Sequence, residues 1–301
     1  MLALAPHPGS LQVDGTVGGG GHAARILEAI APDGRLLGLD ADAAAIERTR
    51  ARLARFGERA VLRRSNFADL ATVAAGAGFD PADGLLLDLG LSSYQLADPD
   101  RGFSFRAEGP LDMRFDPAQG ETAAALLARL DERELAALLR RYGEEPFAGR
   151  IARAIVAARA RGGIERAVDL AAVVEQAVTR PASGRRRVHP ATRVFQALRI
   201  AVNRELEVLE SVLTAGLALL RPGGRLAVLT YHSLEDRIVK RFIAAERRGC
   251  VCPPEVPVCV CGHQPRLRVI PGTPATPGER EIASNPRARS ARLRAAERLS
   301  A

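Results

Sequence analysis

The chain has 301 residues, of which 47% are hydrophobic and 26% charged, as in an ordinary globular protein. This length allows one large domain or two small ones, with a core that needs no disulfide staples. The sequence contains no run of ~18–20 uncharged apolar residues, and residues 1–6 lack the basic start and apolar core of a secretory signal. These features exclude transmembrane, collagenous and small secreted classes, and we expect a cytoplasmic protein.

The net charge of +8 is distributed unevenly along the chain. From Lys240 to the end the sequence has 12 Lys/Arg and 5 Asp/Glu, so nearly all of the basic excess lies in the last fifth. Charge alone leaves two interpretations open: a surface that binds a polyanion, or a solvated basic tail.

The first 100 residues alternate between strand and helix patterns. Strands are predicted at 11–14, 35–40, 60–63 and 85–88, and helices at 22–30 and 42–56. The run 85–87 is entirely leucine, as expected of a strand that is buried on both faces. This alternation predicts a parallel, doubly wound α/β sheet.

A helical segment then interrupts the α/β pattern. Residues 120–180 have Ala/Leu/Arg periodicity typical of successive helices and contain no strand pattern. The α/β pattern resumes with a helix at 192–220, a strand at 225–230 and a helix at 234–245.

This order of patterns predicts an α/β domain with an inserted all-helical domain. We expect residues 1–115 to form the first part of the α/β domain, 116–188 the helical insertion and 189–301 the second part. The last 50 or so residues are rich in proline and arginine, and we expect them to form an appendage.

A glycine-rich loop, 15–21, follows the first strand and precedes a helix. Glycines let the backbone approach a ligand closely, and the helix N-terminus offers unpaired N–H groups. Asp40 ends the second strand, where a carboxylate can accept hydrogen bonds from ribose hydroxyls. Such a loop also occurs as a plain tight turn. The combination of a strand, the glycine-rich loop and an aspartate at the end of the next strand favours an adenosine-containing cofactor.

The residues around the loop point to the kind of cofactor. A dinucleotide needs a Gly-x-Gly-x-x-Gly loop for its pyrophosphate, whereas this loop begins Asp14-Gly15-Thr16 and has no Walker lysine. An acidic residue at this place repels pyrophosphate and suits a cation. S-adenosylmethionine carries a sulfonium and an ammonium group and no phosphate. Asp88, which ends the fourth strand, adds a carboxylate at the same edge, so we expect S-adenosylmethionine there.

With these residues placed, the chain resembles the MraW/RsmH family of bacterial S-adenosylmethionine-dependent methyltransferases. Members of this family modify the N4 amine of a cytidine in the decoding region of 16S rRNA. The matching stretches run through nearly the whole chain in the family's order: 13–22, 87–96, 101–105, 109–114, 192–206, 231–240 and 285–291.

The resemblance implies a class I methyltransferase domain with an inserted helical domain, acting on 16S rRNA within the small ribosomal subunit. It places the cofactor on Gly20, Gly21, His22, Asp40, Phe67, Asp88 and Gln95. Family members usually begin with a His-x-Pro-Val segment and a short helix before the first strand, whereas Leu11 is already strand here. A misassigned start codon and a lost leading helix are the two explanations, and either affects contacts of that segment near the cofactor.

Methylation of an amine requires nitrogen, methyl carbon and sulfur in line, and an acceptor for the amine protons. We expect Asp88 at the methyl-transfer site, either as that acceptor or only as a group that orients the cofactor. DNA amino-methyltransferases have a Pro-Pro-aromatic turn here, which this chain lacks. The Asp14-Gly15-Thr16 loop disfavours a nicotinamide oxidoreductase. The intact loop, Asp40 and Asp88 disfavour a non-catalytic RNA-binding assembly factor.

Several side chains are candidates for RNA contacts: Arg101, Arg106, Arg114, His232, Arg287 and Arg289. The first three have internal ion pairs as their alternative role. His232 has the alternative of capping the helix that follows it, where Ser233 with Asp236 resembles a capping box. Phe103 and Phe105 are expected either to stack on bases or to pack in the core.

Four cysteines, Cys250, Cys252, Cys259 and Cys261, have the spacing C-x-C-x₆-C-x-C, and His263 follows them. Zinc knuckles more often use C-x₂-C pairs, so a structural zinc, reduced thiols and a redox disulfide all stay open. We assign no metal ligand to the reaction.

Overall fold

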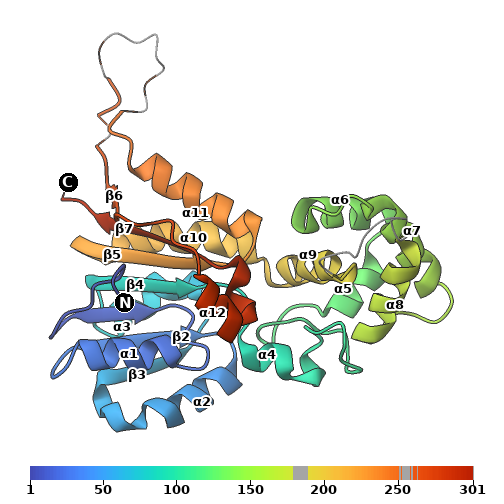
Figure 1. Cartoon of the computed structure of the whole chain (residues 1–301), viewed down its shortest axis with the longest axis horizontal. Helices are drawn as coiled ribbons and strands as arrows, with labels where there is room; N and C mark the ends of the chain where they lie inside the picture. The colour runs from blue at the N-terminus through green and yellow to red at the C-terminus, as the bar shows by residue number, and fades with distance from the viewer. Residues whose placement is uncertain (179–188, 251, 253–257, 259, 263, 301) are drawn as a thin grey trace. The chain divides into compact units, whose positions relative to one another are not determined.

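The computed structural model describes residues 1–178, 189–250, 252, 258, 260–262 and 264–300. The chain forms two compact units (Figure 1). Residues 1–90 and 206–301 form the α/β unit, and residues 91–205 form the helical unit. Within the described residues, none of the helices combines the length and the apolar character that crossing a bilayer requires.

The α/β unit contains a seven-stranded sheet in the order β3-β2-β1-β4-β5-β7-β6. The strands are β1 (Leu11–Asp14), β2 (Arg35–Asp40), β3 (Ala60–Arg64), β4 (Ala82–Asp88), β5 (Leu220–Thr230), β6 (Leu267–Val269) and β7 (Arg292–Arg298). Strands β1 to β5 are parallel, and β7 runs antiparallel to both of its neighbours. The predicted strands 11–14, 35–40, 60–63, 85–88 and 225–230 all lie in this sheet.

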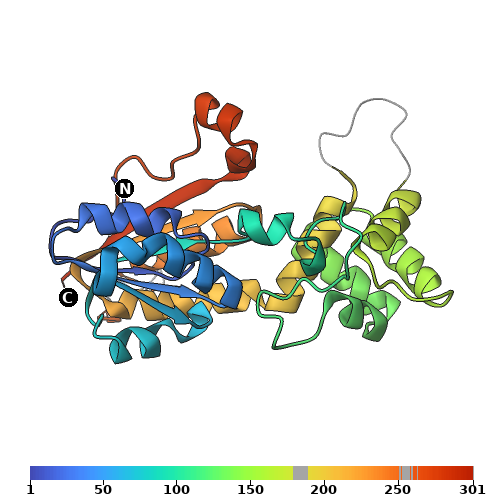
Figure 2. The ribbon, with the colours of Figure 1, turned by 90° about the horizontal axis from the view of Figure 1, so that it is seen from below.

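Helices cover both faces of the sheet (Figure 2). One core contains side chains of α1 (Gly21–Ala29) and α2 (Ala43–Leu53), and the other contains those of α3 (Leu70–Gly76), α10 (Glu205–Leu219) and α11 (Ser233–Glu246). Successive strand residues alternate between the faces, so Leu36 and Leu37 of β2 lie in different cores. The doubly wound α/β prediction is therefore confirmed.

The prediction that the last 50 residues form an appendage is wrong. Strand β7 pairs with β5 along its length, from Arg225 opposite Glu297 to Thr230 opposite Arg292. Ala295 and Ala296 of this strand are buried, with exposed fractions of 1% and 0%. The strand could not be predicted from the sequence because its arginines indicate a solvated segment. Their acidic partner, Asp236, is remote in the sequence and becomes their neighbour only in the fold.

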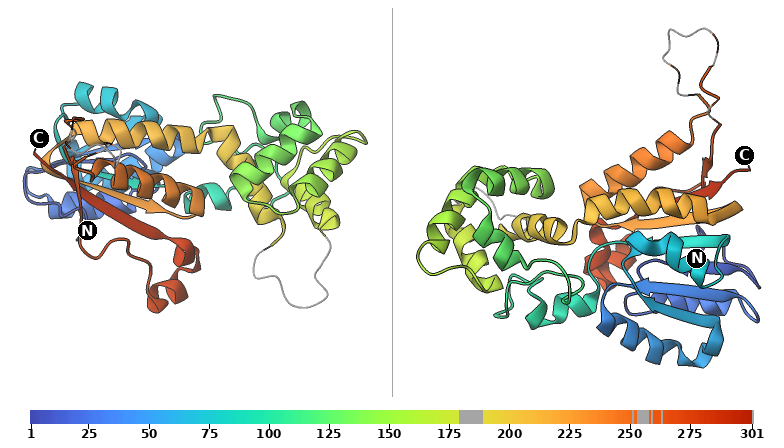
Figure 3. Two further views of the ribbon diagram at one scale, coloured as in Figure 1. Left: turned by 90° about the horizontal axis from the view of Figure 1, so that it is seen from above. Right: turned by 180° about the vertical axis from the view of Figure 1, so that it is seen from behind.

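The helical unit is built from α4 (Ser93–Ala97), α5 (Ala123–Arg129), α6 (Glu132–Gly143), α7 (Ala148–Arg159), α8 (Ala167–Ala177) and α9 (Ala191–Asn203). Figure 3 shows these helices from two further sides. They share one apolar core, which also contains Phe103, Leu111 and Met113. The unit is therefore wider than the expected insertion 116–188, because side chains on both sides of that segment pack into the same core. Residues 179–188 lie outside the described residues.

The helix predicted over 192–220 is two helices, so that prediction is wrong in its continuity. Arg204 has a left-handed backbone with φ of 50° and ends α9. The side chain of Asn203 donates to the carbonyl of Met113 at 2.7 Å and accepts from the N–H of Phe115 at 2.7 Å. These tertiary contacts hold the helix end in place, and no glycine or proline marks it in the sequence.

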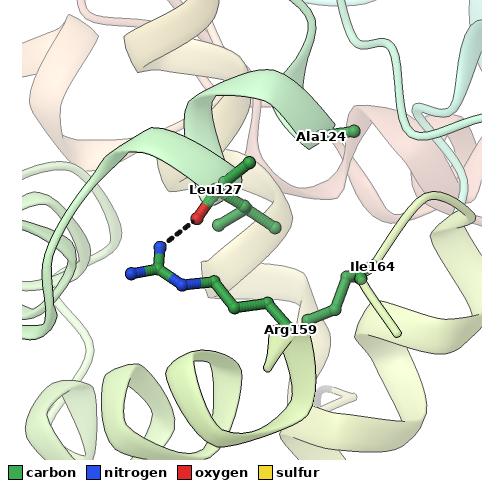
Figure 4. Close-up of a pocket in the computed structure, with 6 residues that line it drawn as sticks. Ala124, Leu127, Arg159 and Ile164 are labelled. Atoms are coloured by element: carbon green, nitrogen blue, oxygen red, sulfur yellow. Dashed lines mark hydrogen bonds between the residues drawn. The ribbon is translucent and has the colours of Figure 1, made fainter. Parts of the chain in front are cut away.

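The helical unit has a surface pocket of about 290 Å³ (Figure 4). Its lining residues are Ala124, Leu127, Ala128, Arg159, Gly163 and Ile164. The guanidinium of Arg159 donates to the carbonyl oxygens of Leu127 and Leu130 and so ties α7 to the end of α5. None of the predicted site residues lines this pocket.

Candidate active site at the carboxyl edge of the sheet

Three aspartates end neighbouring parallel strands of the α/β unit. Asp14 ends β1, Asp40 ends β2 and Asp88 ends β4. Because β1 pairs with both β2 and β4, the carboxyl ends of all three strands meet at one edge. Ligands of open α/β sheets bind at this edge, which was the location predicted from the sequence.

The glycine-rich loop between β1 and α1 is held from α2. Gly18 and Gly20 have positive φ angles of 51° and 73°, which glycine adopts without strain. The hydroxyl of Thr49 donates to the carbonyl of Gly18 at 2.8 Å, and Arg52 donates to that of Gly19 at 2.9 Å. A Cβ atom on Gly20 would lie 3.0 Å from Thr49. The loop is therefore tied to α2 by two hydrogen bonds and a close contact.

Helix α1 begins at Gly21, directly after the glycine-rich loop. Its N-cap residue, Gly20, supplies no side-chain hydrogen bond. A Cβ atom built on Gly21 would meet nothing within 4 Å. The N-terminus of α1 is thus bare of side chains at this point, and its N–H groups suit contact with a polar group of a cofactor.

Asp40 is organised by the loop and by the start of α2. Its Oδ2 accepts the N–H of Gly18 and its Oδ1 accepts the N–H of Asp42, both at 2.9 Å. Burial raises the pKa of this carboxyl, and the two backbone hydrogen bonds oppose that rise. Each carboxylate oxygen has a second lone-pair site, so Asp40 can still accept two ribose hydroxyls. The residue fits the role predicted for it.

Asp14 is the most deeply buried of the three carboxyl groups, with 1% of the residue exposed. Burial raises its pKa to about 7, the hydrogen bond from the N–H of Thr16 and the charge of His22 oppose this rise, and Asp88 and Asp40 add to it. A carboxyl group with such a pKa is ready to lose its proton when a cation arrives beside it. The edge is therefore suited to a positively charged ligand.

Asp88 is held from three sides. Its Oδ1 accepts the hydroxyl of Tyr231 at 2.8 Å, and its Oδ2 lies 3.4 Å from Nε2 of His22. Its backbone N–H donates to the hydroxyl of Thr16 at 2.6 Å. The hydrogen bond to Asp88 raises the pKa of His22, and burial followed by the charge of Asp88 raises the pKa of Tyr231. The carboxylate therefore has a fixed orientation.

Sequence reasoning did not assign a role to Tyr231. This residue follows β5 directly, and β5 is the parallel neighbour of β4, so it reaches the same edge as Asp88. Its position after a buried strand was the available signal. The partner, 143 residues away in the chain, was not visible in the sequence.

The other two predicted cofactor residues lie in different parts of the chain. Phe67 begins a short 3-10 turn, Phe67–Asp69, after β3, and its half-buried side chain packs against the core. Gln95 belongs to the helical unit and is 6% exposed. There it forms a capping box with Ser92 at the start of α4, a structural role that the sequence analysis did not assign.

The arginines predicted to contact RNA in the helical unit differ in their surroundings. Arg101 donates to the carbonyls of Arg114 and Phe115, both at 2.9 Å. Arg114 donates to both oxygens of Asp112 at 2.8 and 2.7 Å, which is the internal ion pair considered as its alternative role. Arg106 is exposed, with its guanidinium 6.0 Å from the ring centre of Phe105.

The two phenylalanines of this segment pack in the core. Phe103 is 5% exposed and belongs to the apolar core of the helical unit. Phe105 stacks on His189 with ring centres 4.3 Å apart and meets Phe195 edge-on at 5.8 Å. Core packing is thus the role that the structure gives them.

His232 caps α11, in agreement with the structural role considered for it. Its Nδ1 accepts the N–H of Glu235 at 3.4 Å, and the Glu235 carboxylate accepts the N–H groups of Tyr231 and His232. The predicted capping box of Ser233 with Asp236 is therefore wrong. Asp236 cannot serve because its carboxylate pairs with Arg294 of β7 at 2.6 Å, which lowers its pKa.

Arg287 and Arg289 lie on the short 3-10 helix Pro286–Ser290, and both are exposed. Other basic residues of the last fifth have intramolecular partners. Arg266 pairs with Glu246 and Arg268 with Glu297, while Arg298 donates to the carbonyl of Ala218 at 2.8 Å. Part of the basic tail thus neutralises the fold's own acidic groups.

The fold and the edge together define a class of protein. Five parallel strands followed by an antiparallel β7, a glycine loop without a pyrophosphate motif and three edge carboxylates are the features of a class I S-adenosylmethionine-dependent methyltransferase. Within that class the chain belongs to the MraW methylase family, whose sequence profile matches residues 1–299. The predicted resemblance is confirmed.

Two curated relatives show how far the similarity extends. A protein of Thermomicrobium roseum named ribosomal RNA small subunit methyltransferase H is 56% identical over 299 residues, covering 99% of this chain and 91% of the relative. A protein of the same name from Geobacter sulfurreducens is 54% identical, covering 98% and 95%. A solved rRNA methylase from Streptococcus thermophilus is 12% identical, with a TM-score of 0.46 and coverage of 99% and 92%.

Proposed function

We propose that this methyltransferase transfers the methyl group of S-adenosylmethionine to the N4 amine of a cytidine in the decoding region of 16S rRNA, within the small ribosomal subunit in the cytoplasm. The relatives named ribosomal RNA small subunit methyltransferase H support the rRNA substrate. The observation that supports an amine as the methyl acceptor is the carboxylate of Asp88, which Tyr231 and His22 hold at the ligand edge.

The residues at the carboxyl edge of the sheet have different roles. Asp40 receives the ribose hydroxyls, the start of α1 at Gly20 and Gly21 receives polar groups of the cofactor, and Phe67 flanks it after β3. Gln95 is kept as a cofactor contact from the resemblance. Asp14 ionises as the cation binds, because a positive charge beside it lowers its pKa from about 7. When bound, the cofactor supplies an electrophilic methyl group on a sulfonium.

Asp88 acts on the amine. A cytosine N4 amine is a poor nucleophile because its lone pair is delocalised into the ring. A carboxylate that accepts its N–H groups turns the lone pair towards the methyl group and stabilises the positive charge that develops on nitrogen. The N–C bond forms as the C–S bond breaks, and the amine then loses one proton to Asp88. His22, whose side chain is half exposed, lies beside Asp88 and passes that proton to water.

The exposed arginines supply the contacts with RNA. Arg287 and Arg289 are the basic residues of segment 285–291 that stand in solvent, and Arg106 is the exposed arginine of the loop 101–106. Arg101, Arg114 and His232, which were also predicted, have intramolecular partners, and we assign them to shaping the surface. Guanidinium groups in solvent suit phosphate oxygens, and such contacts weaken as salt concentration rises.

Methyl transfer from labelled cofactor tests this proposal. The chain is incubated with 30S particles, naked 16S rRNA or duplex DNA, and the product is digested and identified by mass spectrometry. We expect N4-methylcytidine in RNA of the particles. Label found only in DNA would identify a DNA amino-methyltransferase. Cofactor binding by calorimetry without transfer to any substrate would instead identify a non-catalytic assembly factor.

The Asp40→Ala variant tests the cofactor site separately. Removal of a half-buried acceptor for ribose hydroxyls is expected to weaken cofactor binding by about 1–3 kcal/mol. The measurement is isothermal titration calorimetry with S-adenosylmethionine. Unchanged affinity in this variant would refute the role of Asp40.

A further inference from the structure

The cysteine cluster between α11 and β6 is a chemical feature that methyl transfer does not use. The Sγ atoms of Cys250, Cys252 and Cys261 all lie within 4.8 Å of one another. Cys250 and Cys261 are exposed, and Cys252 is half-buried. Exposed thiols form only weak hydrogen bonds with each other, so their own attraction does not account for the convergence.

The spacing of the sulfur atoms matches a metal site. The Sγ atoms of Cys250 and Cys261 are 3.8 Å apart. A disulfide bond would need about 2.05 Å, so these two residues are not joined. Tetrahedral zinc with Zn–S bonds of about 2.3 Å places its sulfur ligands about 3.8 Å from one another. The separation of Cys250 and Cys261 equals this ligand-to-ligand distance, and the Sγ of Cys252 lies within 4.8 Å of both.

The surrounding backbone also favours thiolate ligands. The N–H of Cys252 donates to the Sγ of Cys250 at 3.4 Å, and a hydrogen bond of this kind stabilises negative charge on sulfur. The chain enters the region after Glu246 and returns at Arg266, where the Arg266 N–H donates to the Glu246 carbonyl at 2.7 Å and the two side chains form an ion pair. The base of the region is therefore closed independently of the cysteines.

We propose that Cys250, Cys252 and Cys261 bind one zinc ion, which links the chain that leaves α11 to the chain that leads into β6. Soft thiolate ligands select zinc over magnesium or calcium. Binding releases the three thiol protons to solvent and involves no oxidation. These three residues supply three of the four tetrahedral positions. Cys259 and His263 lie outside the described residues, and the proposal does not depend on them.

Metal analysis of the full-length chain tests the proposal. The reduced protein is stripped with a chelator, loaded with zinc, passed through a desalting column and analysed by inductively coupled plasma mass spectrometry. We expect one zinc per chain. Loading with cobalt instead is expected to produce the thiolate-to-cobalt charge-transfer band and the visible bands of a tetrahedral site. Zinc clearly below one per chain in the reduced protein would overturn the proposal.

Two variants place the metal on the named residues. The double variant Cys250→Ser, Cys261→Ser is expected to lose the zinc and the cobalt bands. The matched control is Val258→Ser, Val260→Ser, which changes two side chains of the same segment that are 71% and 80% exposed, and it is expected to keep both. Circular dichroism and cofactor binding verify that each variant is folded. A folded cysteine variant with a full zinc content would also overturn the proposal.

Discussion

Replacement of Asp14 by asparagine tests the electrostatics of the active-site edge directly. The pKa of this carboxyl is about 7 in the folded chain, whereas its ordinary value, which we take for the unfolded chain, is 3.8. The folded chain therefore binds the proton more tightly than the unfolded chain does. The contribution of Asp14 to stability is fully present below about pH 4 and is lost as the pH rises to about 7.

The magnitude follows from the same shift. One pKa unit corresponds to about 1.4 kcal/mol, so the ionised Asp14 lowers the free energy of unfolding by ~4 kcal/mol above pH 7. Asparagine never ionises. Its Oδ1 can still accept the N–H of Thr16, a hydrogen bond that is 3.1 Å long in the wild type. The new amide N–H groups need partners in a buried place, which costs about 1–3 kcal/mol. At about pH 8 the variant is therefore expected to be more stable by ~1–3 kcal/mol.

The assay is urea unfolding of the cofactor-free protein at a series of pH values. The cost of the amide does not depend on pH, so the pH dependence of the difference in free energy of unfolding between Asp14→Asn and wild type reports the ionisation of Asp14 together with its effect on His22. This difference should shift by ~3 kcal/mol in favour of the variant between about pH 5 and about pH 8. Asp33→Asn, which changes an exposed aspartate, is the matched control and should show no such shift.

The same variant should lose affinity for the cofactor. In the wild type, binding of a cation is expected to release the proton of Asp14, so affinity should rise with pH through about 7. Asp14→Asn should bind more weakly and without this pH dependence. A stability difference that stays constant with pH would show that the pKa of Asp14 is not raised, and the electrostatic reasoning would then fail.

Three further predictions concern single contacts. Tyr231→Phe removes the hydroxyl that orients Asp88 and should lower kcat/KM by about 10- to 100-fold, the effect of one charge-assisted hydrogen bond, with little change in cofactor affinity. Gly21→Ala should leave stability unchanged or raise it by up to ~1 kcal/mol and yet weaken cofactor binding, since its Cβ would stand in open space at the start of α1. The double variant Arg287→Ala, Arg289→Ala should make the slope of log affinity for RNA against log salt concentration shallower, by the amount expected for the loss of about two phosphate contacts.

Matched variants serve as controls for these three measurements. Tyr142→Phe lies in the helical unit and should keep full activity. Gly76 is the last residue of α3, and a Cβ atom there also meets nothing within 4 Å. The variant Gly76→Ala should therefore leave cofactor binding unchanged. Arg25→Ala with Arg133→Ala removes two other exposed arginines and should leave the salt dependence unchanged. Equal effects in a variant and its control would contradict the role assigned to that contact.

The parallel half of the sheet could be predicted from the sequence because burial on both faces leaves an apolar signature. The stretch 85–87 is all leucine, and each of its residues is at most 5% exposed. The acidic edge followed from the same patterns, since Asp14, Asp40 and Asp88 each end a predicted strand. In parallel strands the position along the sequence fixes the edge at which a side chain emerges.

The missed features depend on partners that are remote in sequence. Strand β7 carries arginines at 292 and 294, which indicate a solvated segment until Asp236 is brought beside them. The hydrogen bond between Tyr231 and Asp88 likewise joins two strand ends that only the folded sheet makes adjacent. The end of α9 at Arg204 depends on contacts of Asn203 with residues 113 and 115. Local propensity contains no information about such partners.

The place of β7 between β5 and β6 has a consequence for the order of folding. Strands β1 to β5 can pair as they are synthesised, but the strand with which β6 pairs, β7, follows it in the chain. The edge of β5, and the ion pairs that Asp236 of α11 forms with β7, therefore stay incomplete until residues 292–298 have been synthesised. During translation the unpaired edge of β5 is a place where a nascent chain can associate with other proteins, and arrival of β7 closes it.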